Sequence, residues 1–127
     1  MSKVVKFGGS SLASAEQFKK VGEIICSDPD RRYVVPSAPG KRFKADTKVT
    51  DMLYACYELA EADKDFEAGL SAIEERYEEI RTGLGLTVSL EGEFSLIREN
   101  FKAKAGRDYA ASRGEYLNGI LMAAYLD

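Results

Sequence analysis

The sequence predicts an α/β protein with a parallel sheet, and three observations support this prediction. Two short runs, residues 3–7 and 31–37, are rich in the β-branched and aromatic residues that favour strands. Between them, apolar residues repeat at the spacing of a helix. A strand, a helix and a strand in this order form a right-handed unit whose strands are parallel. From residue 49 onward the pattern is helical, which predicts a helical segment against one edge of the sheet.

The first elements follow from local signals. Residues 3–7 predict a strand that is buried on both faces, as in a parallel sheet. Ser14 opens a capping box before a helix over residues 15–27, and Pro29 stops that helix. Residues 31–37 then form the second strand. We expect both strands to end at the same edge of the sheet.

The first strand is followed by a turn that suits an anion. Gly8 and Gly9 let the backbone approach a ligand without a Cβ in the way, and Ser10 adds a hydroxyl donor. Lys6 would supply positive charge at the carboxyl end of the strand. The order of residues excludes a Walker A loop, in which the lysine follows the glycines. On these residues alone, an ordinary Gly-Gly-Ser turn beside a solvated lysine is the simpler interpretation.

The second strand also ends in small and polar residues. Ser37 should therefore lie at the same edge as Gly8 and Gly9, although an ordinary exit from a strand into a loop explains it more simply. Residues 40–48 are polar and basic. They are equally compatible with a mobile flap near a charged substrate and with a solvated connection.

Apolar stripes at helical spacing predict helices over residues 49–60, 66–80, 91–104 and 108–127. Asp108 is the expected N-cap of the last helix. Glu115 lies on a different face of that helix from the apolar stripe, with the small residues Ser112 and Gly119 on either side. These small residues would let a ligand approach the Glu115 carboxylate. A surface glutamate beside glycines that pack helices is the simpler alternative.

The composition is that of one globular domain. The chain has 127 residues, of which 45% are hydrophobic and 31% charged, enough for a single core. No apolar run approaches the ~18 residues of a membrane span, and no signal-peptide pattern is present, so we expect a cytoplasmic protein without membrane partners. The net charge of −3 gives no basic footprint for nucleic acid.

The reactive side chains are limited in kind. The chain has no histidine, which excludes histidine-dependent triads, histidine–metal sites and histidine general bases. Lysines, carboxylates, hydroxyls and backbone N–H groups remain, and this inventory suits phosphate handling. Cys26 and Cys56 belong to no Cys-x-x-Cys pattern, so we expect buried, reduced thiols and neither a zinc site nor a disulfide.

Several stretches together closely resemble the amino-terminal part of aspartokinases, which are members of the amino-acid kinase family. They are Lys-Phe-Gly-Gly-Ser-Ser at 6–11, Val-Val-Pro-Ser-Ala at 34–38, Thr-Asp-Met-Leu at 50–53 and Ser-Arg-Gly-Glu at 112–115. Only Pro36 departs from the pattern, where the family often has an aliphatic residue. The resemblance covers nearly the whole chain. It implies the parallel-sheet αβα sandwich of the amino-acid kinase, or carbamate kinase-like, type.

The resemblance implies transfer of the γ-phosphoryl group of ATP to the side-chain carboxylate of L-aspartate, which gives 4-phospho-L-aspartate at the start of lysine, threonine and methionine biosynthesis. ATP and Mg²⁺ would be the cofactors. The acceptor carboxylate is already a nucleophile and needs no base, so catalysis can depend on positioning and charge stabilisation.

Seven matched residues take roles by this resemblance. The phosphate-binding group consists of Lys6, Gly8, Gly9 and Ser10. The aspartate-binding group consists of Ser37, Thr50 and Glu115. Lys6 would be the catalytic charge on the phosphates, and Glu115 would bind the substrate ammonium. No metal ligand is assigned in this chain.

Aspartokinases are much longer than this chain. We therefore expect residues 1–127 to be the amino-terminal part of the catalytic domain of a homo-oligomeric enzyme. The nucleotide-binding half, the regulatory ACT domains and the main ligands of the metal would lie beyond Asp127.

Two other functions remain open. Another amino-acid kinase, acting on acetylglutamate, glutamate or carbamate, would use a similar glycine turn. The Ser-Arg-Gly-Glu segment and the two serines after Gly9 favour aspartokinase. The second alternative is a non-catalytic anion-binding or interaction module built on the same turn.

Overall fold

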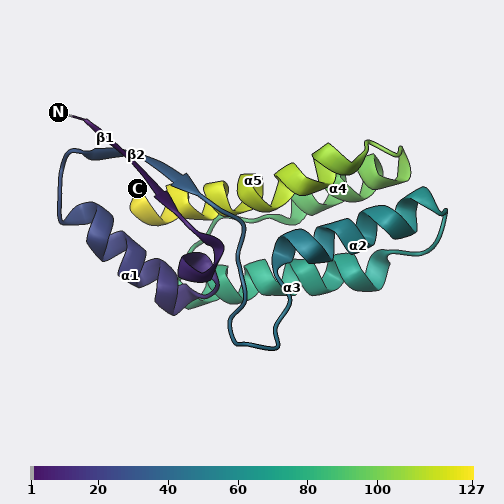
Figure 1. Cartoon of the computed structure of the whole chain (residues 1–127), viewed down its shortest axis with the longest axis horizontal. Helices are drawn as coiled ribbons and strands as arrows, with labels where there is room; N and C mark the ends of the chain where they lie inside the picture. Colours follow the sequence, from purple (N-terminus) through teal and green to yellow (C-terminus); the bar gives the residue numbers. More distant parts are fainter. Residues whose placement is uncertain (1) are drawn as a thin grey trace.

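The computed structural model describes residues 2–127 as a small parallel sheet and a set of packed helices (Figure 1). The first part of the chain contains β1 (Lys3–Phe7), the short 3₁₀ helix η1 (Gly9–Leu12), α1 (Ala15–Cys26) and β2 (Arg31–Pro36). The second part contains α2 (Val49–Glu61), α3 (Glu67–Gly83), α4 (Glu91–Lys102) and α5 (Arg107–Leu126). Among these helices none has the length and apolar character that crossing a membrane requires.

Strands β1 and β2 pair in parallel, which confirms the predicted α/β class. Val5 lies opposite Val34 and Lys6 lies opposite Val35. The ladder continues one step past β2, because the backbone N–H of Ser37 donates to the carbonyl of Phe7 at 3.2 Å. The segment after β2 is therefore held beside the turn after β1.

Helices cover only one face of this sheet. Val5, Phe7 and Val34 pack against the core, whereas Val4 is 69% exposed and Tyr33 is 60% exposed on the other face. Successive side chains of a strand point to opposite faces, so the two sets alternate along each strand. The prediction that the first strand is buried on both faces is wrong for residues 2–127, because none of their elements covers the second face.

The predicted helical segment forms one body that contacts the sheet through α5. Helix α2 contacts α3, α4 and α5, and α1 contacts η1, α3 and α5. Helix α5 also contacts β2. Figure 1 shows α2 and α3 lying side by side, with α4 beside α5. Helix α5 thus connects the helical body to β2.

The core lies where these helices meet. Each helix contributes a fully buried side chain: Phe18 from α1, Leu53 from α2, Tyr77 from α3, Phe94 from α4 and Leu117 from α5. The rings of Tyr77 and Phe94 have centroids 6.1 Å apart. Burial of one such side chain stabilises the fold by roughly 1.5–3 kcal/mol, and the core therefore fixes α5 against α2 and α3.

Helix starts were predicted with mixed success. Ser14 caps α1 as predicted, since its side chain accepts from the backbone N–H of Gln17 at 3.4 Å. The prediction of Asp108 as N-cap of the last helix is wrong. Gly106 holds that position with φ of 105°, a conformation that glycine adopts without strain, and Asp108 lies in the first turn, where its charge suits the helix dipole.

The two cysteines differ in environment. Cys56 is buried, as predicted, and burial raises the pKa of its thiol to about 11. Cys26 is exposed, which contradicts the prediction. It follows the buried Ile25 by one residue, a turn of about 100° around the helix axis, and so points away from the buried stripe of α1.

Candidate functional site

A cleft of about 470 Å³ opens where β1 and β2 end. Four parts of the chain form its wall: the turn after β1, the segment after β2, the first turn of α2 and one residue of α5. The lining residues are Gly9, Ser10, Ser37, Ala38, Pro39, Gly40, Lys41, Lys48, Thr50 and Glu115. This volume lies in the range of small-molecule sites, which is roughly 300–1,000 Å³.

The structure brings five of the seven candidate residues together. Those that line the cleft are Gly9, Ser10, Ser37, Thr50 and Glu115. Lys6 and Gly8 do not line it. Lys6 is exposed and alternates with the core-facing Val5 and Phe7, so its side chain projects from the open face of the sheet. Gly8 is the exposed N-cap of η1, directly before the lining residue Gly9.

Glycines allow the two turns of the cleft to touch. The backbone N–H of Gly40 donates to the carbonyl of Gly9 at 2.8 Å. A Cβ at Gly40 would lie 2.6 Å from the carbonyl carbon of Gly9, and a Cβ at Gly9 would lie 3.0 Å from the carbonyl oxygen of Ala38. Any larger residue at position 40 would therefore push the two turns apart.

A glycine that allows close packing also places Glu115 at the cleft. A Cβ at Gly114 would lie 2.6 Å from the Cβ of Ala38, so only glycine lets α5 approach the segment after β2 this closely. The hydroxyl of Tyr77 donates to the carbonyl of Gly114 at 2.8 Å. Burial raises the pKa of that hydroxyl, which keeps it protonated as a donor. The glycine of the Ser-Arg-Gly-Glu segment is thus a packing requirement that presents the next residue to the cleft.

The cleft combines both signs of charge. Lys41 and Lys48 contribute two ammonium groups to its wall and Glu115 contributes one carboxylate, beside the hydroxyls of Ser37 and Thr50. Such a wall is complementary to a ligand that carries two anionic groups and one ammonium group. Sequence reasoning did not single out these two lysines, although the basic composition of residues 40–48 was a signal for them.

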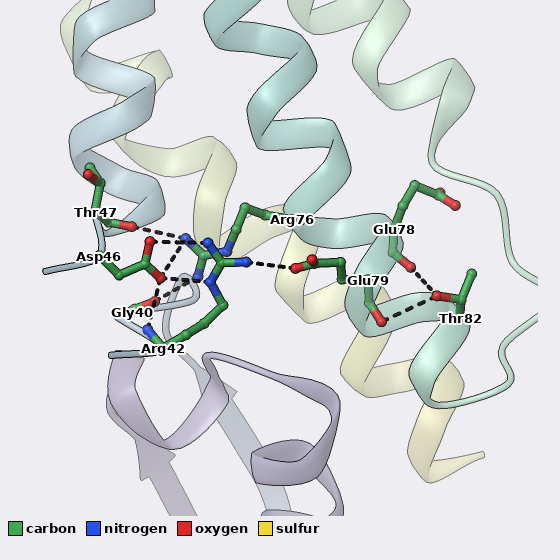
Figure 2. A network of polar contacts seen from close by, with 8 residues as sticks. All are labelled: Gly40, Arg42, Asp46, Thr47, Arg76, Glu78, Glu79 and Thr82. Atoms are coloured by element: carbon green, nitrogen blue, oxygen red, sulfur yellow. Dashed lines mark hydrogen bonds and ion pairs between the residues drawn. The ribbon is translucent and has the colours of Figure 1, made fainter. Parts of the chain in front are cut away.

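The loop over residues 40–48 is anchored to α3 by ion pairs (Figure 2). Arg42 donates to Asp46 through Nε at 2.7 Å and through Nη2 at 3.1 Å. Its Nη1 donates to Glu79 of α3 at 2.8 Å. The hydrogen bonds from Arg42 hold the pKa of Asp46 well below its usual range. This network favours an ordered connection over a mobile flap.

The described residues do not form a metal site of their own. Nowhere in residues 2–127 do three or more histidine, cysteine or acidic side chains gather as metal ligands. The cleft itself offers one carboxylate, that of Glu115. Mg²⁺ prefers six oxygen ligands, so this donor set does not fit the ion without ligands from elsewhere.

The comparisons of this chain with known proteins agree with one another. The sequence model described as the amino acid kinase family matches residues 1–127. Aspartokinase 3 of Bacillus subtilis is 42% identical over 129 residues, which cover 97% of this chain and 28% of the relative. The crystal structure of Clostridium acetobutylicum aspartate kinase matches with a TM-score of 0.94 and 47% identity, over 97% of this chain and 28% of that one.

A third match is more distant. The crystal structure of E. coli aspartokinase III in complex with aspartate and ADP aligns with a TM-score of 0.77 and 27% identity. The alignment covers 99% of this chain and 29% of that chain. The chain therefore spans less than a third of the length of each of these three proteins.

Proposed function

Because the chain belongs to the amino acid kinase family, we propose that it forms the amino-terminal part of an aspartokinase, which transfers the γ-phosphoryl group of ATP to the side-chain carboxylate of L-aspartate. One observation supports this most directly. In a chain that is similar to aspartokinases over 97% of its residues, the glycine turn, the hydroxyls and Glu115 meet at one cleft.

The charges of the cleft suit L-aspartate, which carries two carboxylates and one ammonium group at neutral pH. We assign Glu115 to the ammonium, because it is the acidic residue of the cleft wall. Ser37 and Thr50 would donate hydrogen bonds to the carboxylates, and Lys41 and Lys48 would balance their charge. E. coli aspartokinase III, one of the structural relatives, was crystallised with aspartate and ADP.

The phosphate-binding role falls to the turn after β1. The backbone N–H groups of Gly8 and Gly9 and the hydroxyl of Ser10 would hold the transferring group. A Cβ at Gly8 would meet no atom of the described residues within 4 Å, so packing inside the chain does not require a glycine there. A glycine at position 8 would instead leave space for a ligand beside the turn. Lys6, on the open sheet face beside this turn, would neutralise phosphate charge.

The reaction needs little from the protein beyond placement. The aspartate carboxylate attacks the γ-phosphorus, the bond to the bridging oxygen breaks, and ADP leaves with that electron pair. No proton has to be removed from the nucleophile, which agrees with a chain that has no histidine. Mg²⁺ is expected by resemblance, but the described residues do not supply its site and none of these steps uses it.

Adenine binding is proposed to belong to residues outside this chain, together with the regulatory domains. Cytoplasmic location and homo-oligomeric assembly remain predictions.

The test is a substrate screen of the full-length polypeptide that carries this chain. ADP release is followed with L-aspartate, glutamate, N-acetylglutamate and carbamate as acceptors. We expect turnover with L-aspartate alone. Turnover with another acceptor would identify a different amino-acid kinase. Absence of turnover, together with no calorimetric binding of nucleotide or aspartate, would favour the non-catalytic module.

Two variants separate the proposed roles. Lys6→Ala should lower kcat by about 10²-fold or more, because loss of one charge that stabilises the transition state typically costs 10²–10³-fold. Glu115→Gln should raise the KM for aspartate and leave the KM for ATP near its original value. Lys20→Ala is the control, since this exposed lysine lies on α1 and outside the cleft wall. Normal kcat in Lys6→Ala would make Lys6 a solvated surface residue.

A further inference from the structure

Two polar side chains are buried among the described residues, Arg76 at 4% exposure and Asn118 at 0%. A buried polar group, and above all a buried charge, reduces stability unless hydrogen bonds compensate for the lost water. Both side chains donate to backbone carbonyls of the same stretch, residues 37–47, of which residues 37–41 line the cleft. Buried hydrogen-bond donors from α3 and α5 therefore bind the same segment of the chain.

Arg76 of α3 connects the two ends of the loop over residues 40–48. Its Nη1 donates to the carbonyl of Thr47 at 2.9 Å, and its Nη2 donates to the carbonyl of Gly40 at 2.7 Å (Figure 2). One planar guanidinium thus fixes two carbonyls that lie seven residues apart in sequence. The cleft residues Lys41 and Lys48 follow these two carbonyls directly.

The charge of Arg76 is balanced inside the same network. Asp46 lies 3.7 Å from Arg76 and also accepts from Arg42, which in turn donates to Glu79. Figure 2 shows the two guanidinium groups converging on Asp46. The carboxylate therefore holds both arginines against the loop.

Asn118 of α5 fixes the other end of the segment. Its Nδ2 donates to the carbonyl of Ser37 at 2.7 Å. Asn118 lies three residues after Glu115, almost one turn further along the helix. This hydrogen bond sets the position of α5 relative to Ser37, and both Ser37 and Glu115 line the cleft.

Stability alone does not favour Arg76 and Asn118 at these buried positions. The Nε of Arg76 and the Oδ1 of Asn118 are buried and have no hydrogen-bond partner in the described part of the chain. An unsatisfied buried polar atom costs stability, and apolar residues of similar size often serve a core equally well or better. A role in shaping the cleft accounts for donors that stability alone does not favour.

We propose that Arg76 and Asn118 are positioning residues that hold residues 37–48 in the shape that binds aspartate. Neither residue touches the substrate. Arg76 acts through the carbonyls of Gly40 and Thr47, and Asn118 acts through the carbonyl of Ser37. The kinetic part of this inference rests on the proposed function, whereas the anchoring of the segment can be tested without it.

The kinetic test uses the full-length polypeptide with Arg76→Met, Arg76→Lys and Asn118→Leu. We expect kcat/KM for aspartate to fall about 10²-fold, as for a displacement of about 1 Å in a binding segment, with a much smaller change in the KM for ATP. Arg76→Lys should not restore activity, because an ammonium is a point donor that does not span both carbonyls.

Arg81→Met is the matched control. Arg81 lies on the same helix and also donates a guanidinium N–H to a backbone carbonyl, that of Leu86, but Leu86 belongs to none of the segments that line the cleft. We expect its aspartate kinetics to match those of the unaltered protein. An equal loss of kcat/KM in Arg81→Met and Arg76→Met would overturn the positioning role.

A second measurement tests directly how firmly residues 37–48 are held. Trypsin cleaves after lysine and arginine, and Lys41, Arg42 and Lys44 lie in the loop. We expect cleavage there to be much faster in the Arg76 variants at a temperature where circular dichroism shows them folded. In the unaltered protein, hydrogen exchange at the amides of Gly40 and Val49 should be as slow as in the core. This measurement does not depend on whether a variant folds.

Fast exchange at those two amides, or unchanged cleavage in folded Arg76 variants, would refute the anchoring. If the unaltered polypeptide does not phosphorylate aspartate, the proposed function fails. The proteolysis and exchange results still decide the structural role.

Discussion

Gly9 and Gly40 show how single residues set the dimensions of the cleft. Their backbones are joined by a hydrogen bond of 2.8 Å, and there is no room for a Cβ at position 40. The sequence predicts that the glycine turn after β1 lets a ligand approach its backbone. The contact between Gly9 and Gly40, which lie 31 residues apart, is not indicated by any local pattern.

Gly40→Ala should therefore destabilise the protein by roughly 1–3 kcal/mol, the usual cost of overpacking against backbone. It should also weaken aspartate binding, because the two turns must separate. Gly92→Ala is the control, since a Cβ there meets no atom within 4 Å in helix α4. That change should stabilise by up to about 1 kcal/mol through helix propensity. Urea unfolding of both variants measures the difference, and equal stabilities would contradict the steric argument.

Elements were predictable where local chemistry marks their ends. Ser14 and Pro29 lie at or near helix boundaries that the structure confirms, because a cap or a missing N–H acts within one turn. The short helix η1 was not predicted, since its four residues carry no periodic pattern. The sequence places Arg76 on a charged helix face that is most simply solvated surface, and this interpretation is wrong, because the side chain is buried. Its role depends on carbonyls 29 and 36 residues earlier in the chain.

The loop over residues 40–48 should make the free energy of unfolding depend on pH in the acid range. The pKa of Asp46 is lowered from its usual 3.8, first by the hydrogen bond from Arg42. Because the folded pKa lies below the unfolded pKa, this group stabilises the fold at pH values above 3.8, and the contribution is lost as pH falls toward the folded pKa. Asp46→Asn should lower the urea midpoint at pH 7 and show a smaller loss between pH 4 and 2, a window set by the lowered pKa. Parallel pH profiles for the two proteins would show that Asp46 is not linked to folding.

At the scale of the whole molecule, the sheet is the least complete part of residues 2–127. Its open face carries Val4, Tyr33 and Val35, all well exposed. The sequence of β1 indicated burial on both faces, as in a larger parallel sheet. That pattern and the structure agree if elements of the full-length polypeptide outside these residues cover this face. The proposed phosphate-binding residue Lys6 lies on the same face.

We therefore predict that the 127 residues alone do not phosphorylate aspartate. Phosphoryl transfer needs both reactants held in line at about 3–3.5 Å, and we propose that the adenine pocket that fixes ATP belongs to residues outside this chain. Exposed apolar side chains on the open sheet face should also make the isolated chain self-associate as its concentration rises. ADP release by the purified chain with aspartate and MgATP, compared with the full-length polypeptide at equal molarity, measures the first effect. Sedimentation velocity over a concentration series measures the second. Turnover by the isolated chain close to that of the full-length polypeptide would show that the nucleotide site lies within these residues.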